Sequence, residues 1–150
     1  MQTRPWKFIL VALTVSCVVW GADPLVGTFK LNAEKSKLHN PVQSETLKVD
    51  LIAPNTYRSV IDIVNTKGEK RHTEVIRIAD GKEHPVEAVN RPLGDTQIAS
   101  PGLRKVVLKK DGKVVSEMEI KASPEGHIVT QTGTDANGKP YKDVIVWERQ

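Results

Sequence analysis

Residues 56–64 of the chain, TYRSVIDIV, carry the pattern that decides its fold class. From Tyr57 to Ile63 every second residue is apolar or small, whereas Arg58 and Asp62 fall between them. Because successive side chains of a strand point to opposite faces, this spacing predicts a β-strand with one face in a core and the other in water.

The same period of two recurs on both sides of that segment. The runs are separated by the Gly and Asn residues that tight turns need for a positive φ, most clearly at Asp111-Gly112 and Asn137-Gly138. About ten strands are predicted in total. Besides residues 56–64 they cover residues 26–31, 45–52, 71–78, 103–109, 113–121, 127–134 and 141–149, with weaker candidates at 84–89 and 96–99.

The order of these elements predicts an all-β domain. Consecutive hairpins without crossover helices form an antiparallel up-and-down meander, and closing the meander removes its exposed edges. We therefore expect about eight to ten strands closed into a barrel, which can fill itself with side chains or hold one small ligand. Residues 32–38, NAEKSKL, predict one short helical turn after the first strand, and Pro41 ends it.

The first 22 residues have the pattern of a secretory signal peptide. Arg4 and Lys7 lead into an apolar run over residues 8–20, and Gly21 and Ala22 supply the small residues of a cleavage point. The run is shorter than the roughly 20 apolar residues that cross a membrane. We expect cleavage after Ala22 and a periplasmic or secreted mature domain at residues 23–150, with no integral membrane span once the leader is removed.

Cys17 offers one alternative for the leader. Residues 14–17, TVSC, are similar to the site at which bacterial lipoproteins are lipidated, although Thr14 stands where Leu is usual. A lipid anchor through Cys17 is therefore the minor alternative to its removal with the leader. Since Cys17 is the only cysteine of the chain, the mature sequence predicts no disulfide and no cysteine metal site.

The charge of the mature domain gives no reason to expect a polyanionic partner. The chain has 22 Lys and Arg against 18 Asp and Glu, for a formal net charge of +4. Arg4 and Lys7 belong to the leader, so 20 basic residues face 18 acidic ones in the mature domain, which gives +2. This balance and the few aromatic residues predict no nucleic-acid partner. We expect the domain to be a monomer.

No motif in the sequence identifies a reaction. His39, His72, His84 and His127 stand far apart, and none has a second ligand at a metal-binding spacing, so we predict no metal and no cofactor. The sequence contains no Gly-x-Ser-x-Gly nucleophile motif, and the mature chain has no cysteine to activate. We predict no catalytic residues and expect that the protein is not an enzyme.

Two stretches of the chain resemble a known superfamily. Residues 23–32, DPLVGTFKLN, are similar to the opening of the calycins, which comprise the lipocalins and the fatty-acid-binding proteins. Residues 141–150, YKDVIVWERQ, are similar to the closing strand of a fatty-acid-binding protein. With residues 133–140, GTDANGKP, these stretches also resemble exported bacterial lipocalin-like proteins. The resemblance implies a barrel that binds a small apolar or amphipathic ligand without catalysis.

The chain departs from this superfamily at two places. Phe29 stands where the first strand of lipocalins has Trp. Ile145 and Trp147 stand where fatty-acid-binding proteins carry the Arg and Tyr that hold a carboxylate. The resemblance therefore implies the fold without that carboxylate site. It also implies that Arg149 packs over Phe29 at one end of the barrel.

Five inward-facing residues are the candidates to line a ligand cavity, namely Phe29, Tyr57, Ile61, Ile63 and Trp147. If they fill the core instead, the protein is a structural or interaction module of the cell envelope. A third alternative is a small lipocalin-like enzyme such as an isomerase. A cavity above about 300 Å³ favours ligand binding, whereas a perturbed acid or histidine projecting into that cavity favours the enzyme.

Overall fold

The computed structural model describes residues 21–88, 91–100 and 102–150, with side chains described outside residues 86–101. Most of the predicted leader, Cys17 included, lies outside the described residues. Within them, no helix has the length and apolar character needed to cross a membrane.

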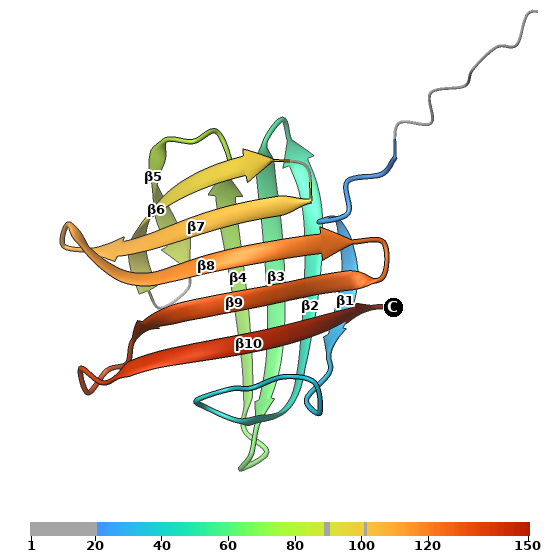
Figure 1. Ribbon diagram of the computed structural model, residues 1–150, viewed down its shortest axis with the longest axis vertical. Helices are drawn as coiled ribbons and strands as arrows, with labels where there is room; N and C mark the ends of the chain where they lie inside the picture. The colour runs from blue at the N-terminus through green and yellow to red at the C-terminus, as the bar shows by residue number, and fades with distance from the viewer. Residues whose placement is uncertain (1–20, 89–90, 101) are drawn as a thin grey trace, which may run out of the picture.

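The described chain forms ten antiparallel strands that close into a barrel (Figure 1). Each strand pairs with the next, and β1 pairs with β10 to complete the ring. In Figure 1, β2, β3 and β4 stand upright behind β7 to β10, which cross in front of them. The predicted all-β meander is therefore confirmed. The strands are β1 (Gly27–Leu31), β2 (Val42–Ala53), β3 (Thr56–Asn65), β4 (Lys70–Ile78), β5 (Glu83–Ala88), β6 (Arg91–Ser100), β7 (Leu103–Lys110), β8 (Lys113–Ser123), β9 (Gly126–Thr134) and β10 (Pro140–Arg149).

The first and last strands close the ring in a fixed register. Phe29 lies opposite Arg149 and Leu31 lies opposite Trp147. On its other edge, β1 places Phe29 opposite Leu47 of β2. Residues that lie opposite one another share a face of the sheet, so the inward-facing set of each strand is aligned with that of its neighbours around the barrel.

Local turn chemistry shapes two of the hairpins. Asn55, between β2 and β3, and Asp111, between β7 and β8, take positive φ values of 54° and 52°. Asn and Asp tolerate this left-handed conformation better than other residues that carry a Cβ. Gly112 follows with a φ of 74°, so Asp111-Gly112 forms the predicted two-residue turn.

The two weak strand candidates are full members of the barrel. β6 pairs with β5 along one edge and with β7 along the other. Pro92 and Gly94 interrupt the alternation of β6 in the sequence. Its place in the sheet therefore depends on pairing with its neighbours more than on its own pattern.

The helical turn predicted at residues 32–38 is not formed, and a turn followed by a β-bridge takes its place. The side-chain oxygen of Asn32 accepts a hydrogen bond from the Lys35 amide at 2.9 Å. Lys37 then pairs with Val144 of β10. Because β10 extends past the end of β1, its free backbone groups need partners, and pairing with them is favoured over a short isolated helix.

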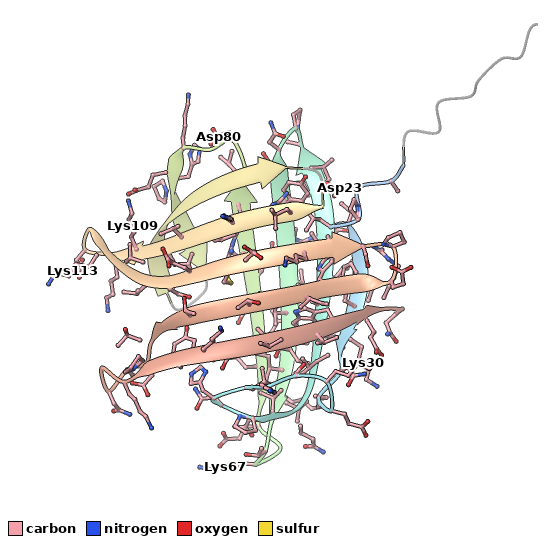
Figure 2. All side chains as sticks on the ribbon, viewed as in Figure 1. Asp23, Lys30, Lys67, Asp80, Lys109 and Lys113 are labelled. Carbon is pink, nitrogen blue, oxygen red and sulfur yellow. The ribbon has the colours of Figure 1, made fainter. Side chains whose placement is uncertain are left out.

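An apolar core closes one end of the barrel. Phe29 is fully buried and Trp147 is 6% exposed. Figure 2 shows Asp23 at this end and Lys67, in the β3–β4 hairpin, at the opposite end. The other buried members of the core cluster are Leu25, Leu31, Val49, Tyr57, Ala79 and Val129.

Arg149 holds the two ends of the chain together at the closed end, as the resemblance implies. Its guanidinium carbon lies 4.7 Å from the centre of the Phe29 ring, in a cation–π contact. Its two Nη atoms donate to the carbonyl oxygens of Val26 and Pro24, each at 2.8 Å. A Cβ at residue 27 would occupy the place of this guanidinium, so the site requires Gly27.

Truncation of Phe29 is expected to destabilise the barrel strongly. In Phe29→Ala, the lost ring area and the cavity left behind lower the free energy of unfolding by about 3–5 kcal/mol. Urea unfolding followed by circular dichroism measures this change. Thr28→Ala, at an exposed neighbouring position of β1, is the control and should change the free energy by less than about 0.5 kcal/mol. A loss below about 1 kcal/mol in Phe29→Ala would contradict a core anchored on this ring.

Candidate functional site

The end of the barrel opposite the apolar core contains a cavity of about 830 Å³. The turns between β3 and β4 and between β9 and β10 border it, together with the start of β2, at the lower end of Figure 1. Part of its wall is apolar and comes from Leu38, Val42, Ile63 and Ile145. The polar residues of its lining include His39, Glu45, Arg71, Gln131, Tyr141 and Asp143.

One wall of the cavity is the connection between β1 and β2, residues 32–41, which we term the mouth segment. Figure 1 shows it directly below β10. The Ser36 hydroxyl accepts a hydrogen bond from the Val146 amide at 2.9 Å. The next residue, Lys37, donates through its amide to the Val144 carbonyl oxygen at 2.7 Å. These contacts bring His39 against β10.

His39 of the mouth segment is bound at two points by Asp143 of β10. The backbone amide of His39 donates to Oδ1 of Asp143 at 2.8 Å, and Nδ1 of its ring lies 2.7 Å from Oδ2. Asp143 is buried, with 6% of its surface exposed. A carboxylate only accepts, so Nδ1 of the ring donates to it, and in the neutral form of the ring the lone pair lies on Nε2. The side-chain amide of Asn40 lies 2.8 Å from that Nε2.

Tyr141 supports the ring of His39 from the side of β10. The two rings are stacked, with their centres 3.9 Å apart and their planes 16° from parallel. The Tyr141 hydroxyl accepts a hydrogen bond from Nε2 of Gln131 at 3.0 Å. The phenol also needs the space beside Gly133, where a Cβ would lie 2.8 Å from the Tyr141 oxygen. Tyr141 therefore has a fixed position from which it orients His39.

Glu45 contributes a second titratable group to the cavity. It lies on β2 opposite Ile63 of β3 and faces inward. Burial raises the pKa of its carboxyl from 4.5 to about 7, and the charge of Arg71 offsets a part of this rise. At neutral pH the carboxyl is protonated in about half of the molecules, and in this form it donates a hydrogen bond.

The rim of the cavity carries charges of both signs. Lys70 and Arg71 of β4 are exposed there, close to Glu69 and to Asp135 of the β9–β10 turn. Glu69 and Asp135 already serve the turns, since Glu69 accepts from the Asn65 side chain and Asp135 from the Lys139 amide. The rim of the cavity therefore carries both positive and negative charges, and these would not select a ligand by its net charge alone.

The five predicted cavity residues do not form one site. Ile63 lines the cavity, and Ile61, two residues earlier on β3, is half-buried on the same inward face. Phe29 and Trp147 belong to the apolar core at the other end. Tyr57 lies there too, where it lines a small pocket of about 80 Å³.

The hydroxyl of Tyr57 donates to Asp23 at 2.6 Å, and the Arg104 guanidinium carbon lies 4.0 Å above its ring. Burial and the hydrogen bond to Asp23 together raise the pKa of the Tyr57 phenol. Tyr57 therefore ties the segment ahead of β1 to the closed end.

Sequence reasoning missed the polar residues of the open cavity. His39 and Asp143 are 104 residues apart, so no local spacing relates them. The inward position of Glu45 could have been predicted from the sequence, because Glu45 alternates in step with Leu47 and Val49 on the same strand. In the described part of the chain, no three His, Cys, Asp or Glu side chains gather as metal ligands.

Comparison with known proteins identifies the fold. No protein-family model and no curated protein matches the sequence. The crystal structure of a mutant of the fluorescent protein UnaG matches with a TM-score of 0.61 and 16% identity, over 85% of this chain and 97% of that one. Wild-type UnaG matches with a TM-score of 0.58 and 17% identity, over 85% and 98%. The likeness shows the fold alone, an antiparallel all-β barrel.

The raised pKa of Glu45 makes stability depend on pH in a defined direction. The folded protein binds this proton up to about pH 7, whereas the unfolded chain releases it near 4.5. The contribution of Glu45 to stability therefore falls as pH rises between these values and stays lower above them. We therefore compare the free energy of unfolding of Glu45→Gln with that of wild type. Allowing for partial exposure of the carboxyl, the difference in favour of the variant should be about 2 kcal/mol larger at pH 8 than at pH 4.

Urea unfolding across this pH range measures the difference. Glu117→Gln, at an exposed position on β8, is the matched control. Parallel pH profiles for wild type and Glu45→Gln would show that burial does not hold the proton on this carboxyl.

Proposed function

We propose that this protein binds a small molecule in the open-end cavity. The observation that carries the proposal is the cavity itself, because about 830 Å³ of space at the end of a closed barrel is within the range of known ligand pockets, roughly 300–1,000 Å³. A barrel with a filled interior, as a purely structural module would have, leaves no such space. The fold similarity to UnaG is compatible with this function, but it does not indicate which ligand is bound.

The lining supports an amphipathic ligand rather than a purely apolar one. Ile63 and Ile145 offer apolar contact on two sides. The same lining includes the Tyr141 hydroxyl, the Gln131 amide and Glu45, which together supply donors and acceptors. A ligand with a flat or branched apolar body and a few hydrogen-bonding groups would satisfy both sets, whereas a plain hydrocarbon chain would leave the polar set without partners.

Filling the cavity should weaken binding without unfolding the barrel. Ile63→Trp places a larger ring in the space and should weaken the binding of the dye 8-anilinonaphthalene-1-sulfonate by about tenfold. Fluorescence titration measures the dissociation constant, and thermal unfolding confirms that the variant is folded. Ile76→Trp is the control, since Ile76 lies on β4 with 46% of its surface exposed. Equal affinity in wild type and Ile63→Trp would place the dye elsewhere.

A natural ligand should remain with the protein during gentle purification. Native mass spectrometry of the mature protein from its own host is expected to show a bound species that denaturation releases. If no species co-purifies, and if neither the dye nor a panel of lipids and metabolites raises the melting temperature, the ligand-binding proposal fails.

We also propose that the protein is exported. The proposal rests on the charged and apolar pattern of residues 1–22, which ends in Gly21 and Ala22. Mass spectrometry of the protein from the envelope or medium of its host should find a chain that begins at Asp23. A chain that still carries Cys17 with added lipid mass would favour a membrane anchor instead.

A further inference from the structure

We propose that His39 and Asp143 form a proton-transfer site in the open-end cavity, with Nε2 of His39 as a general base toward a bound carbon acid. This inference rests on the proposed function, since the molecule must first occupy the cavity. It goes further by assigning a reaction to the site. The substrate class is a compound whose C–H bond is made acidic by a neighbouring carbonyl or C=N group.

The geometry of the pair has the features that a general base needs. Asp143 binds the backbone amide and Nδ1 of His39 with its two oxygens, at 2.8 and 2.7 Å, so the ring has one orientation and one tautomer. The stacked ring of Tyr141 blocks one face of the imidazole. Nε2 is then the basic atom of the ring, and a proton it accepts is stabilised by the carboxylate on the far side of the ring.

Two other His–Asp pairs on the barrel show what is particular to this one. His72 lies 2.6 Å from Asp62, but the side chains are 63% and 60% exposed, on the outer face of β3 and β4. His84 lies 2.8 Å from Asp80 within one turn of chain. Neither pair lines the open-end cavity. Only 8% of the Asp143 side chain is exposed, and a carboxylate so removed from water stabilises a neighbouring imidazolium more strongly.

Asn40 marks the place where the reacting proton would lie. Its side-chain amide is 2.8 Å from Nε2 of His39, so a donor already occupies the lone pair. Asn40 is exposed and makes no other hydrogen bond among those recorded for the described side chains. A ligand can therefore displace it without leaving a buried polar group unpaired.

The same cavity holds an acid to complement this base. Glu45 lines it on the β2 side, and burial keeps its carboxyl protonated in a large share of molecules at neutral pH, where its pKa is about 7. Two titratable groups with different environments in one cavity allow one to accept a proton while the other donates. The charge of Arg71 at the rim partly opposes this protonation.

The step balances without any further reactant. Nε2 of His39 takes the proton from a carbon beside a carbonyl, and the C–H electron pair becomes the double bond of an enol. The carbonyl π pair moves to its oxygen, which takes the proton of Glu45. In a substrate that also has a β,γ double bond the enol is a dienol, so the imidazolium gives its proton to the γ carbon, the carbonyl re-forms and Glu45 recovers the proton from its oxygen. The net change is an isomerisation by proton transfer, with no oxidant and no leaving group.

The test uses 5-nitrobenzisoxazole, a carbon acid that reports on a base in a cavity. Removal of its ring C–H proton sends that electron pair into a nitrile as the N–O bond breaks, and the coloured phenolate is released. Wild-type mature protein should accelerate this reaction with saturation by the probe. His39→Gln should lower kcat/KM by about 100-fold, and circular dichroism should show an unchanged fold.

The matched control is His72→Gln, which removes the histidine of the exposed pair on the outer face. It should leave kcat/KM within about twofold of wild type. If wild type and His39→Gln accelerate the probe equally, or if His72→Gln is as impaired as His39→Gln, the proposal is wrong.

Asp143 is a positioning residue in this scheme, so its variant needs a readout beyond folding. Asp143→Asn should lower kcat by about tenfold while KM for the probe changes little, because the cavity remains but the base loses its fixed tautomer. Addition of free imidazole to His39→Ala should restore a part of the rate, and it should have no such effect on Asp143→Asn. A KM increase alone in Asp143→Asn, with kcat unchanged, would show a purely structural role.

Failure of this proposal can be told apart from failure of ligand binding. If 8-anilinonaphthalene-1-sulfonate binds the wild type and not Ile63→Trp, while no variant differs in proton transfer, the cavity binds but does not catalyse. If the probe reacts at a rate that depends on His39, and Ile63→Trp abolishes this rate, both proposals stand. Absence of dye binding together with absence of catalysis would overturn both.

Discussion

Phe29 and Arg149 lie opposite one another where the first strand pairs with the last, and this pairing of strands closes the barrel. The ring of Phe29 gives the core its most buried side chain, and the guanidinium lies on its face. Hydrogen bonds from Arg149 to the backbone at residues 24 and 26 then bring the chain ahead of β1 over the same end. A sheet left open here would expose two unpaired edges, β1 and β10.

Closure at one end allows the other end to be polar. The apolar cluster around Phe29 and Trp147 buries enough surface to hold the ring of strands together at that end. The opposite end can then keep Glu45 and Asp143 facing inward, which a barrel with a uniformly packed interior would not tolerate. The desolvation that raises the pKa of Glu45 is therefore a consequence of placing a carboxyl inside a barrel that other residues stabilise.

The alternation of residues 56–64 and its repeats were sufficient to predict the strands, the meander and the closed barrel, because the period of two depends only on local geometry. The Asp111-Gly112 hairpin follows from the same level of argument. The contact of Arg149 with Phe29 came from the family resemblance, and the structure confirms it. The prediction of a helical turn was wrong, because Ser36 and Lys37 bind to β10 through contacts that no local sequence pattern indicates.

The candidate site was less predictable than the fold, because the period of two carries no information about contacts between residues that are distant in the sequence. Alternation correctly places Tyr57 and Ile63 inside, but it does not give their height along the barrel axis, so it could not separate the core residue from the cavity residue. The height is fixed by the stagger between strands. His39 lies outside any strand, and its position depends on contacts with Asp143 and Tyr141, which are distant in the sequence.

The pairing of β1 with β10 also determines the order in which the chain can fold. The contacts from Arg149 to Pro24 join residues 125 positions apart, so the loop that they close contains almost the whole barrel. Hairpins such as β3–β4 and β7–β8 pair residues that are near in sequence and can form early during synthesis, but the edge of β1 has no partner until β10 has been made. The barrel therefore belongs with the slow-folding topologies of high contact order. A chain crossing a membrane from its N-terminus would arrive with that edge exposed, at the stage when pairing with other chains is the main hazard.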